Sequence, residues 1–240
     1  MFVPASLSGA WYGQGARKLA LMYATLFDFD GVLVDSEPVH LAAFNDVLAP
    51  QGIELAHHEY VERYLSLDDA GVFRDALSRR QRTLREEEVR ALVEAKHPRF
   101  LARFADSFRV FPGAVELLAR RAERGPVGIV SGALHEEITF ALDRMGARGA
   151  VRFIVSAERT TAPKPDPAPY LLGLDELRRL GHDGGVVVVE DSPGGVVSAK
   201  KAALRCVAVA HSCGHDELSR AGADAVTADL VSLTDALLEG

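Results

Sequence analysis

Short apolar runs alternate with amphipathic helical patterns from residue 110 to the end of the chain. Each run is apolar at successive positions, which is typical of a strand buried on both faces of a parallel sheet. Helices that return to such a sheet by right-handed crossovers give a doubly wound, Rossmann-like α/β core. In this class of fold, functional groups lie just beyond the carboxyl ends of the strands. The predicted strands are 127–131, 151–155, 185–189, 205–209 and 223–226.

One further strand comes earlier, in the segment ATLFDFDGVLVDSE over residues 24–37. It ends on Asp28 and Asp30, whose side chains point the same way because they lie two positions apart in an extended segment. Gly31 then allows a sharp turn. Two carboxylates held this close repel each other unless a cation lies between them or one of them is protonated. A hard divalent ion such as Mg²⁺ meets that need, and a carboxylate beside it can attack phosphorus.

Three other predicted strands lead to polar groups. Ser131 and Gly132 follow the first of them, Lys164 stands between two prolines beyond the next, and Glu190 with Asp191 follows a run of valines. Alone, each has an ordinary structural explanation: a turn serine, an exposed loop lysine, or an acidic start to a helix. Together with the first acid pair, they predict a magnesium site that holds a phosphoryl group against a carboxylate nucleophile.

The intervening segment is helical and charge-rich, with no strand pattern. Ser36 is expected to cap its first helix. We interpret residues 37–108 as a small helical cap domain, inserted into a core formed by residues 23–36 and 109–240. Residues 1–22 have neither strand nor helix periodicity, so they are expected to be a disordered N-terminal extension, with Met22 as an alternative start.

Composition excludes several functions. The net charge is −7, from 34 acidic and 27 basic residues, and no basic stripe with interleaved aromatics indicates nucleic-acid binding. No apolar run approaches the ~20 residues that cross a bilayer. Cys206 and Cys213 form no disulfide framework and no CxxC pair, so a cytoplasmic location is expected. We expect a monomer whose only partner is a small phosphorylated metabolite.

Four segments, DFDGVLVDSE, VSG, KPDP and VVEDSPGG, resemble the motifs of the haloacid dehalogenase-like hydrolase superfamily. The resemblance covers about residues 23–210 and is strongest to the branch that holds β-phosphoglucomutase and phosphoglycolate phosphatase. It implies a Mg²⁺-dependent phosphatase for a sugar phosphate or a phosphoglycolate-like compound, working through an aspartyl-phosphate. The alternative that it leaves open is a β-phosphoglucomutase-like phosphomutase.

The resemblance also implies roles for individual residues. Asp28 would attack phosphorus, and Asp30 would act as general acid and then as general base. Ser131 and Gly132 would bind the phosphoryl group, and Lys164 would offset its charge. The implied Mg²⁺ ligands are Asp28, the backbone carbonyl of Asp30, Glu190 and Asp191.

Three other activities that use similar residues can be compared with this sequence. Dehalogenases lack an acid at the position of Asp30, and Lys96, the only lysine of the insert, lies far from where phosphonatases carry theirs. A signalling receiver domain gathers similar groups, but its lysine comes last along the chain, whereas Lys164 precedes Glu190. None of these three activities is therefore expected.

The choice between phosphatase and mutase depends on the insert. His40 matches a histidine that mutases carry, and it is either a substrate ligand or a packing residue at the hinge. Asp69 stands where mutases place a phosphate-binding arginine, and an acid there would repel a second phosphate, which favours a phosphatase. Arg63 and Arg74 are further candidates for substrate contacts, although both are also explained as solvated helix residues.

Overall fold

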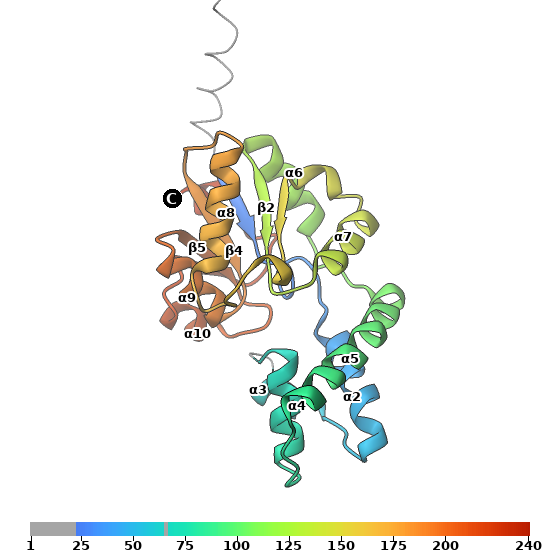
Figure 1. The fold of residues 1–240 in the computed structure, drawn as a ribbon. Helices are drawn as coiled ribbons and strands as arrows, with labels where there is room; N and C mark the ends of the chain where they lie inside the picture. Colours follow the sequence, from blue (N-terminus) through green and yellow to red (C-terminus); the bar gives the residue numbers. More distant parts are fainter. Residues whose placement is uncertain (1–22, 65–66) are drawn as a thin grey trace, which may run out of the picture.

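The computed structural model describes residues 23–64 and 67–240, so the predictions for residues 1–22, including a start at Met22, lie outside the described residues. The core is one six-stranded sheet in the order β3-β2-β1-β4-β5-β6, with every pair of neighbouring strands parallel (Figure 1). The predicted α/β class is therefore confirmed. The strands are β1 (Ala24–Phe27), β2 (Val127–Val130), β3 (Phe153–Val155), β4 (Val186–Glu190), β5 (Arg205–Val209) and β6 (Ala225–Thr227).

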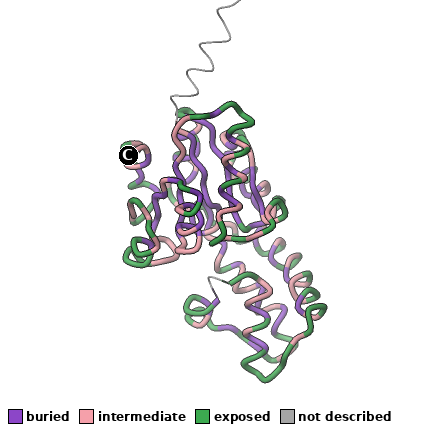
Figure 2. The backbone as a smooth tube through the Cα atoms, turned by 60° about the vertical axis from the view of Figure 1, so that its left-hand side comes forward, coloured by how far each residue is buried: buried purple, intermediate pink, exposed green. Residues whose placement is uncertain are grey.

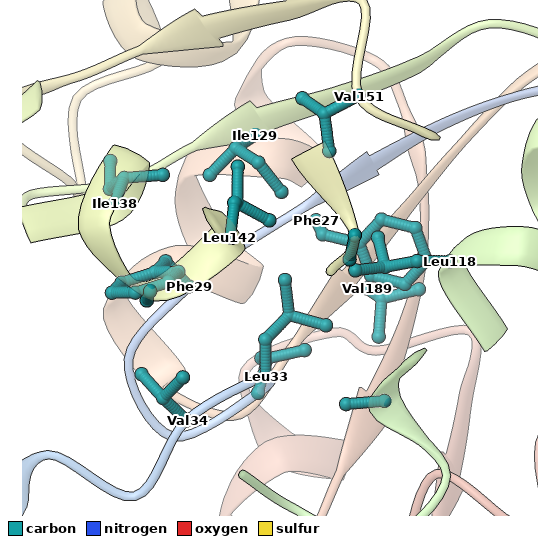
Figure 3. Close-up of a cluster of buried hydrophobic side chains, with 14 of the residues drawn as sticks. Phe27, Phe29, Leu33, Val34, Leu118, Ile129, Ile138, Leu142, Val151 and Val189 are labelled. Atoms are coloured by element: carbon teal, nitrogen blue, oxygen red, sulfur yellow. The ribbon is translucent and has the colours of Figure 1, made fainter. Parts of the chain in front are cut away.

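Alternate side chains of each strand point to opposite faces of the sheet and enter two separate apolar clusters. Helices cover both faces and bury these clusters. Phe27, Ile129 and Val189 lie in the cluster that Figure 3 shows, beneath α6 (Ala114–Arg124), α7 (His135–Arg144) and α11 (Asp235–Glu239). Their neighbours Leu26 and Val188 lie in the other cluster. That cluster is covered by α8 (Ala168–Arg179), α9 (Pro193–Lys201) and α10 (His215–Arg220). Figure 2 shows the central strands as buried runs, and β1 and β2 are buried at every position.

The predicted elements need three corrections. Helix α10 was not expected, because it is short and polar and buries only Leu218, which leaves no periodic stripe in the sequence. The last helix begins at Asp235 rather than near residue 230. The third strand begins at Phe153 rather than at residue 151, because Arg148–Ala150 forms a 3₁₀ turn just before it.

The inserted segment folds into helices with an apolar centre of their own, around Phe44, Tyr60 and Phe73. Figure 1 shows these helices as a cap beyond the end of the sheet at which β1 leads into α2, and Figure 2 marks the buried residues along them. The cap helices are α2 (Glu37–Leu48), α3 (His57–Arg63), α4 (Asp69–Ser78) and α5 (Glu86–Ser107).

The two segments that join cap and core run side by side. Val34, on the way into the cap, forms an antiparallel bridge with Val110, on the way out. On either side of this bridge, Asp35 N donates to Arg109 O and Phe111 N donates to Leu33 O, each at 3.0 Å. The cap is therefore attached through a short hydrogen-bonded ribbon rather than through two independent linkers.

Among the described residues, none of the helices combines the length and the apolar character that crossing a membrane requires. This agrees with the absence of a long apolar run in the sequence.

A buried arginine ties the C-terminal helix to the sheet. The Arg121 side chain is fully buried and donates to Thr25 Oγ1, to Asp235 Oδ1 and, at 2.7 Å, to Glu239 Oε1. Arg124 also donates to Glu239, and these hydrogen bonds from two guanidinium groups lower the pKa of Glu239 to about 2.

This shift predicts how stability depends on pH. Because the folded pKa of Glu239 lies below its ordinary value of 4.5, its contribution is present above pH 4.5 and is lost as pH falls towards 2. Since the side chain is 23% exposed, we expect Glu239→Gln to lower the free energy of unfolding by roughly 1–2 kcal/mol at pH 7. Urea unfolding should show the difference between wild type and variant shrinking below pH 4.5. The control is Glu123→Gln, an exposed position on α6, and equal effects of the two changes would contradict the role of Glu239.

Candidate active site

The first acid pair lies at the carboxyl end of β1. The backbone N–H of Asp28 donates to Val189 O at 2.9 Å, which carries the sheet pairing one residue past the strand. Gly31 then turns with φ +75°, and a Cβ at this position would lie 1.9 Å from Asp191 Oδ2. The turn therefore requires glycine both for its left-handed backbone and for the close approach of Asp191.

Lys164 connects three strand ends. Its Nζ donates to Asp28 Oδ1 at 2.5 Å, to Glu190 Oε1 at 2.7 Å and to the carbonyl of Val130 at 2.9 Å. The side chain is 14% exposed, so these contacts replace most of its hydration. Although burial disfavours the charged ammonium, the carboxylates of Asp28 and Glu190 raise the pKa of Lys164 above its ordinary value, so it remains a cation. The structure thus places the Lys164 ammonium in direct contact with Asp28 and Glu190.

Glu190, the last residue of β4, is fully buried and accepts hydrogen bonds on both oxygens. Oε1 accepts from Lys164 and from the Tyr170 hydroxyl, each at 2.7 Å. Oε2 accepts from the backbone N–H groups of Asp191 and Ser192 and from the Ser192 hydroxyl. Glu190 thus fixes the position of Lys164 as well as the entry to α9. Tyr170 was not anticipated, because a tyrosine on the buried stripe of a helix looks like a core residue.

The donor set fits a hard divalent cation. Asp28, Glu190 and Asp191 each place a carboxylate oxygen within 4.8 Å of the others, and all three residues are buried. Burial and the charge of Glu190 raise the pKa of Asp191, and burial also raises that of Asp28, although Lys164 opposes it. One lysine leaves two of the three negative charges uncompensated, and a divalent ion with oxygen ligands would compensate them.

Asp30 lies apart from this group. Its Oδ1 accepts a hydrogen bond from the Ser36 hydroxyl at 2.5 Å. The expected capping role of Ser36 is therefore wrong in one respect: Ser36 occupies the N-cap position of α2, but its side chain makes no capping hydrogen bond because it binds Asp30. Burial raises the pKa of Asp30 to about 7, while the Ser36 hydrogen bond acts in the opposite direction.

Ser131 and Gly132 lie at the carboxyl end of β2, beside β1 in the sheet. Ser131 is buried, and its hydroxyl oxygen accepts the backbone N–H of Ala133 at 3.1 Å. A Cβ on Gly132 would meet no atom within 4 Å, so open space adjoins this backbone. No hydrogen bond joins Ser131 to Asp28 among the described residues.

His40, on α2, finds its partners on the neighbouring cap helix α5. Its ring stacks on Phe100 with centroids 4.2 Å apart, and Lys96 Nζ lies 2.8 Å from its Nδ1. Burial and the charge of Lys96 lower the pKa of His40 well below its ordinary value, so the imidazole is neutral and accepts from the ammonium.

Lys96 itself was missed as a site residue. It is only 2% exposed and donates to Asp69 Oδ1 at 2.5 Å. Its position on an apolar stripe of the predicted helix, together with Val89, Leu92 and Val93, was a signal of burial in the sequence. By contrast, Arg74 pairs with Glu86, and Arg63 is exposed, so neither is brought to the acid cluster.

Comparison with known proteins identifies the family. Residues 25–209 match the family model described as haloacid dehalogenase-like hydrolase, so the chain belongs to this family. It is 28% identical over 217 residues to a phosphoglycolate phosphatase of Rhodospirillum rubrum, covering 88% of this chain and 89% of that one. It is 30% identical over 188 residues to hexitol phosphatase B of Escherichia coli, covering 78% and 82%.

Solved structures of this family share the fold of the chain. CbbY from Rhodobacter sphaeroides, in complex with phosphate, superposes with a TM-score of 0.75 at 26% identity, covering 92% of this chain and 100% of that one. A β-phosphoglucomutase from Clostridium difficile shares the fold at 19% identity, with a TM-score of 0.76. The predicted family, with its inserted cap, is confirmed, and the chain is a phosphohydrolase of this family.

Proposed function

We propose that this enzyme is a Mg²⁺-dependent phosphatase that hydrolyses a small phosphorylated metabolite, a sugar phosphate or a phosphoglycolate-like compound, through an aspartyl-phosphate on Asp28. The observation that carries the proposal is the contact of Lys164 Nζ with Asp28 Oδ1 at 2.5 Å. Asp28 also belongs, with Glu190 and Asp191, to a group of three carboxylates whose oxygens lie within 4.8 Å of one another. A fixed cation and a hard metal ion are what a carboxylate needs to approach an anionic phosphoryl group.

In the first step, a carboxylate oxygen of Asp28 would form a bond to phosphorus while the bond from phosphorus to the leaving oxygen breaks. Asp30 would give its proton to that oxygen. In the second step, Asp30 would take a proton from water as the water attacks phosphorus and Asp28 is released. The hydrogen bond from Ser36 supports this role by holding the Asp30 carboxyl in place.

The remaining residues would hold and balance charge. Lys164 would offset the charge on the phosphoryl oxygens, and Ser131 with the adjacent Gly132 amide would hydrogen-bond to them. Asp28, Asp191, Glu190 and the Asp30 carbonyl would hold Mg²⁺, which when bound neutralises charge on the transferring group. Because both oxygens of Glu190 already accept hydrogen bonds, we assign it a further role in positioning Lys164.

We also propose the division into a core of residues 23–36 and 109–240 and a cap of residues 37–108. The separate apolar centre of the cap supports this division. Two free cysteines, Cys206 and Cys213, support action in the cytoplasm.

Removal of the metal tests the proposal. Treatment with EDTA should reduce phosphate release from a small phosphomonoester to background, and added Mg²⁺ should restore it. Unchanged release in EDTA would contradict a metal-dependent mechanism.

The phosphomutase alternative is tested on the same preparation. A mutase would be activated by a sugar bisphosphate and would return an isomeric monophosphate, whereas a phosphatase releases inorganic phosphate at the same rate as it consumes substrate. We favour the phosphatase because Asp69 removes the free positive charge that a second phosphate would need in the cap.

A further inference from the structure

The ion pair in the cap bears on which substrates the enzyme accepts. Lys96 is buried, packs its ammonium over the Phe44 ring at 4.1 Å from the centroid, and donates to both Asp69 and His40. A cation held by an aromatic face, a carboxylate and an imidazole has its three donors largely committed. Asp69, at the start of α4, therefore neutralises the charge of Lys96 through an ion pair.

Lys96 lies close to Asp30 along the first turn of α2: Asp30 accepts from Ser36 at 2.5 Å, His40 N donates to Ser36 O at 3.0 Å, and the His40 ring contacts Lys96. Two further ionisable groups near this part of α2 are carboxyls: Glu37 accepts from the Tyr60 hydroxyl at 2.7 Å, and burial raises the pKa of both Glu37 and Glu137, so neither supplies positive charge. Glu137, at the start of α7, also lies 3.6 Å from His97, the residue after Lys96, so the cap and the core meet here. Once Asp69 has balanced Lys96, none of these side chains offers a free positive charge to a group bound beside Asp30.

Asp30 is the proposed proton donor to the leaving group, so the leaving group must occupy these surroundings. From this charge balance we infer that Asp69 is a specificity-determining residue, which selects substrates with one phosphate and an uncharged, hydroxyl-bearing leaving group. The inference rests on the proposed function and narrows it: phosphorylated sugars or sugar alcohols are accepted, and compounds with a carboxylate or a second phosphate are disfavoured. Carboxylates accept hydrogen bonds from hydroxyls and repel a second anion, and a neutral imidazole offers an anion no compensating charge.

The experiment compares kcat/KM, with Mg²⁺, for size-matched esters. Glycerol phosphate is set against phosphoglycolate, and a hexitol monophosphate against a hexose bisphosphate. In the wild type, we expect kcat/KM to be at least tenfold higher for glycerol phosphate and for the hexitol monophosphate, whose leaving groups are uncharged, than for their partners. For each pair, the ratio compares kcat/KM of the ester with an anionic leaving group to kcat/KM of the ester with an uncharged one. Asp69→Asn should raise this ratio at least tenfold, because the ammonium of Lys96 becomes available to the anion.

Two further variants separate charge from folding. Lys96→Met keeps a long, unbranched side chain beside the Phe44 ring but removes the cation, so the double variant Asp69→Asn with Lys96→Met should return the ratio towards the wild-type value. Asp75→Asn is the matched control, since Asp75 lies on the same helix and pairs with Arg79 on the exposed surface of the cap. It should leave the ratio unchanged.

A wild-type preference for the anionic member of both pairs, or an unchanged ratio in Asp69→Asn, would overturn the inference. Failure of the proposed function looks different. In that case even p-nitrophenyl phosphate, which carries no second anion, would release no phosphate, whereas failure of the inference alone leaves its hydrolysis intact.

Discussion

Asparagine in place of Asp28 is expected to abolish phosphate release, with kcat falling by at least about 10⁴-fold, since a covalent mechanism loses its nucleophile. The amide has nearly the shape of the carboxylate but cannot form the acyl-phosphate. Lys164 keeps its contact with Glu190 in this variant, so the fold should survive. Steady-state release of inorganic phosphate measures the effect, and circular dichroism confirms the fold.

A matched control and a direct assay sharpen this result. Asp143→Asn removes an exposed carboxylate from α7 and should leave kcat unchanged. Acid quenching of the wild type during turnover should trap phosphate on the peptide that contains Asp28. Substantial turnover by the Asp28→Asn enzyme would eliminate Asp28 as the nucleophile.

Methionine in place of Lys164 is expected to lower kcat by roughly 10²–10⁴-fold, the range typical of a lost electrostatic group in a buried site. The ammonium contacts Asp28 and Glu190 at once, so its loss leaves these two carboxylates without a cationic partner in the described part of the chain. Their repulsion should also lower the melting temperature in EDTA, and Mg²⁺ should restore part of it. Differential scanning fluorimetry with and without Mg²⁺ measures this second effect.

The neighbouring Lys201 provides the comparison. It donates to the carbonyl of Pro165 at 3.1 Å, next to Lys164 in the chain, but it is exposed. Lys201→Met should therefore change neither kcat nor the response to Mg²⁺. If the two lysine variants behaved alike, Lys164 would be no more than a loop residue.

The sequence predicted the positions at strand ends better than the contacts between side chains. Asp28, Lys164 and Asp191 could be placed together because parallel strands carry their carboxyl ends to one edge, whatever the details of packing. The hydrogen bond from Ser36 to Asp30 could not be predicted, because a serine before a helix is explained equally well as a cap.

The cap was harder to predict for a related reason. Helical periodicity indicates which face of α5 is buried, but not what that face meets. Lys96 and Asp69 are 27 positions apart, and only the packing of α4 against α5 brings them to 2.5 Å. A sequence shows the acid at position 69 but not the lysine that balances it.

The ribbon between Val34 and Val110 has a mechanical consequence. Since the outgoing and returning segments are hydrogen-bonded to each other, we expect any movement of the cap to bend both segments together. A proline at position 111 removes the N–H that donates to Leu33 O, so it should loosen this attachment of the cap to the core.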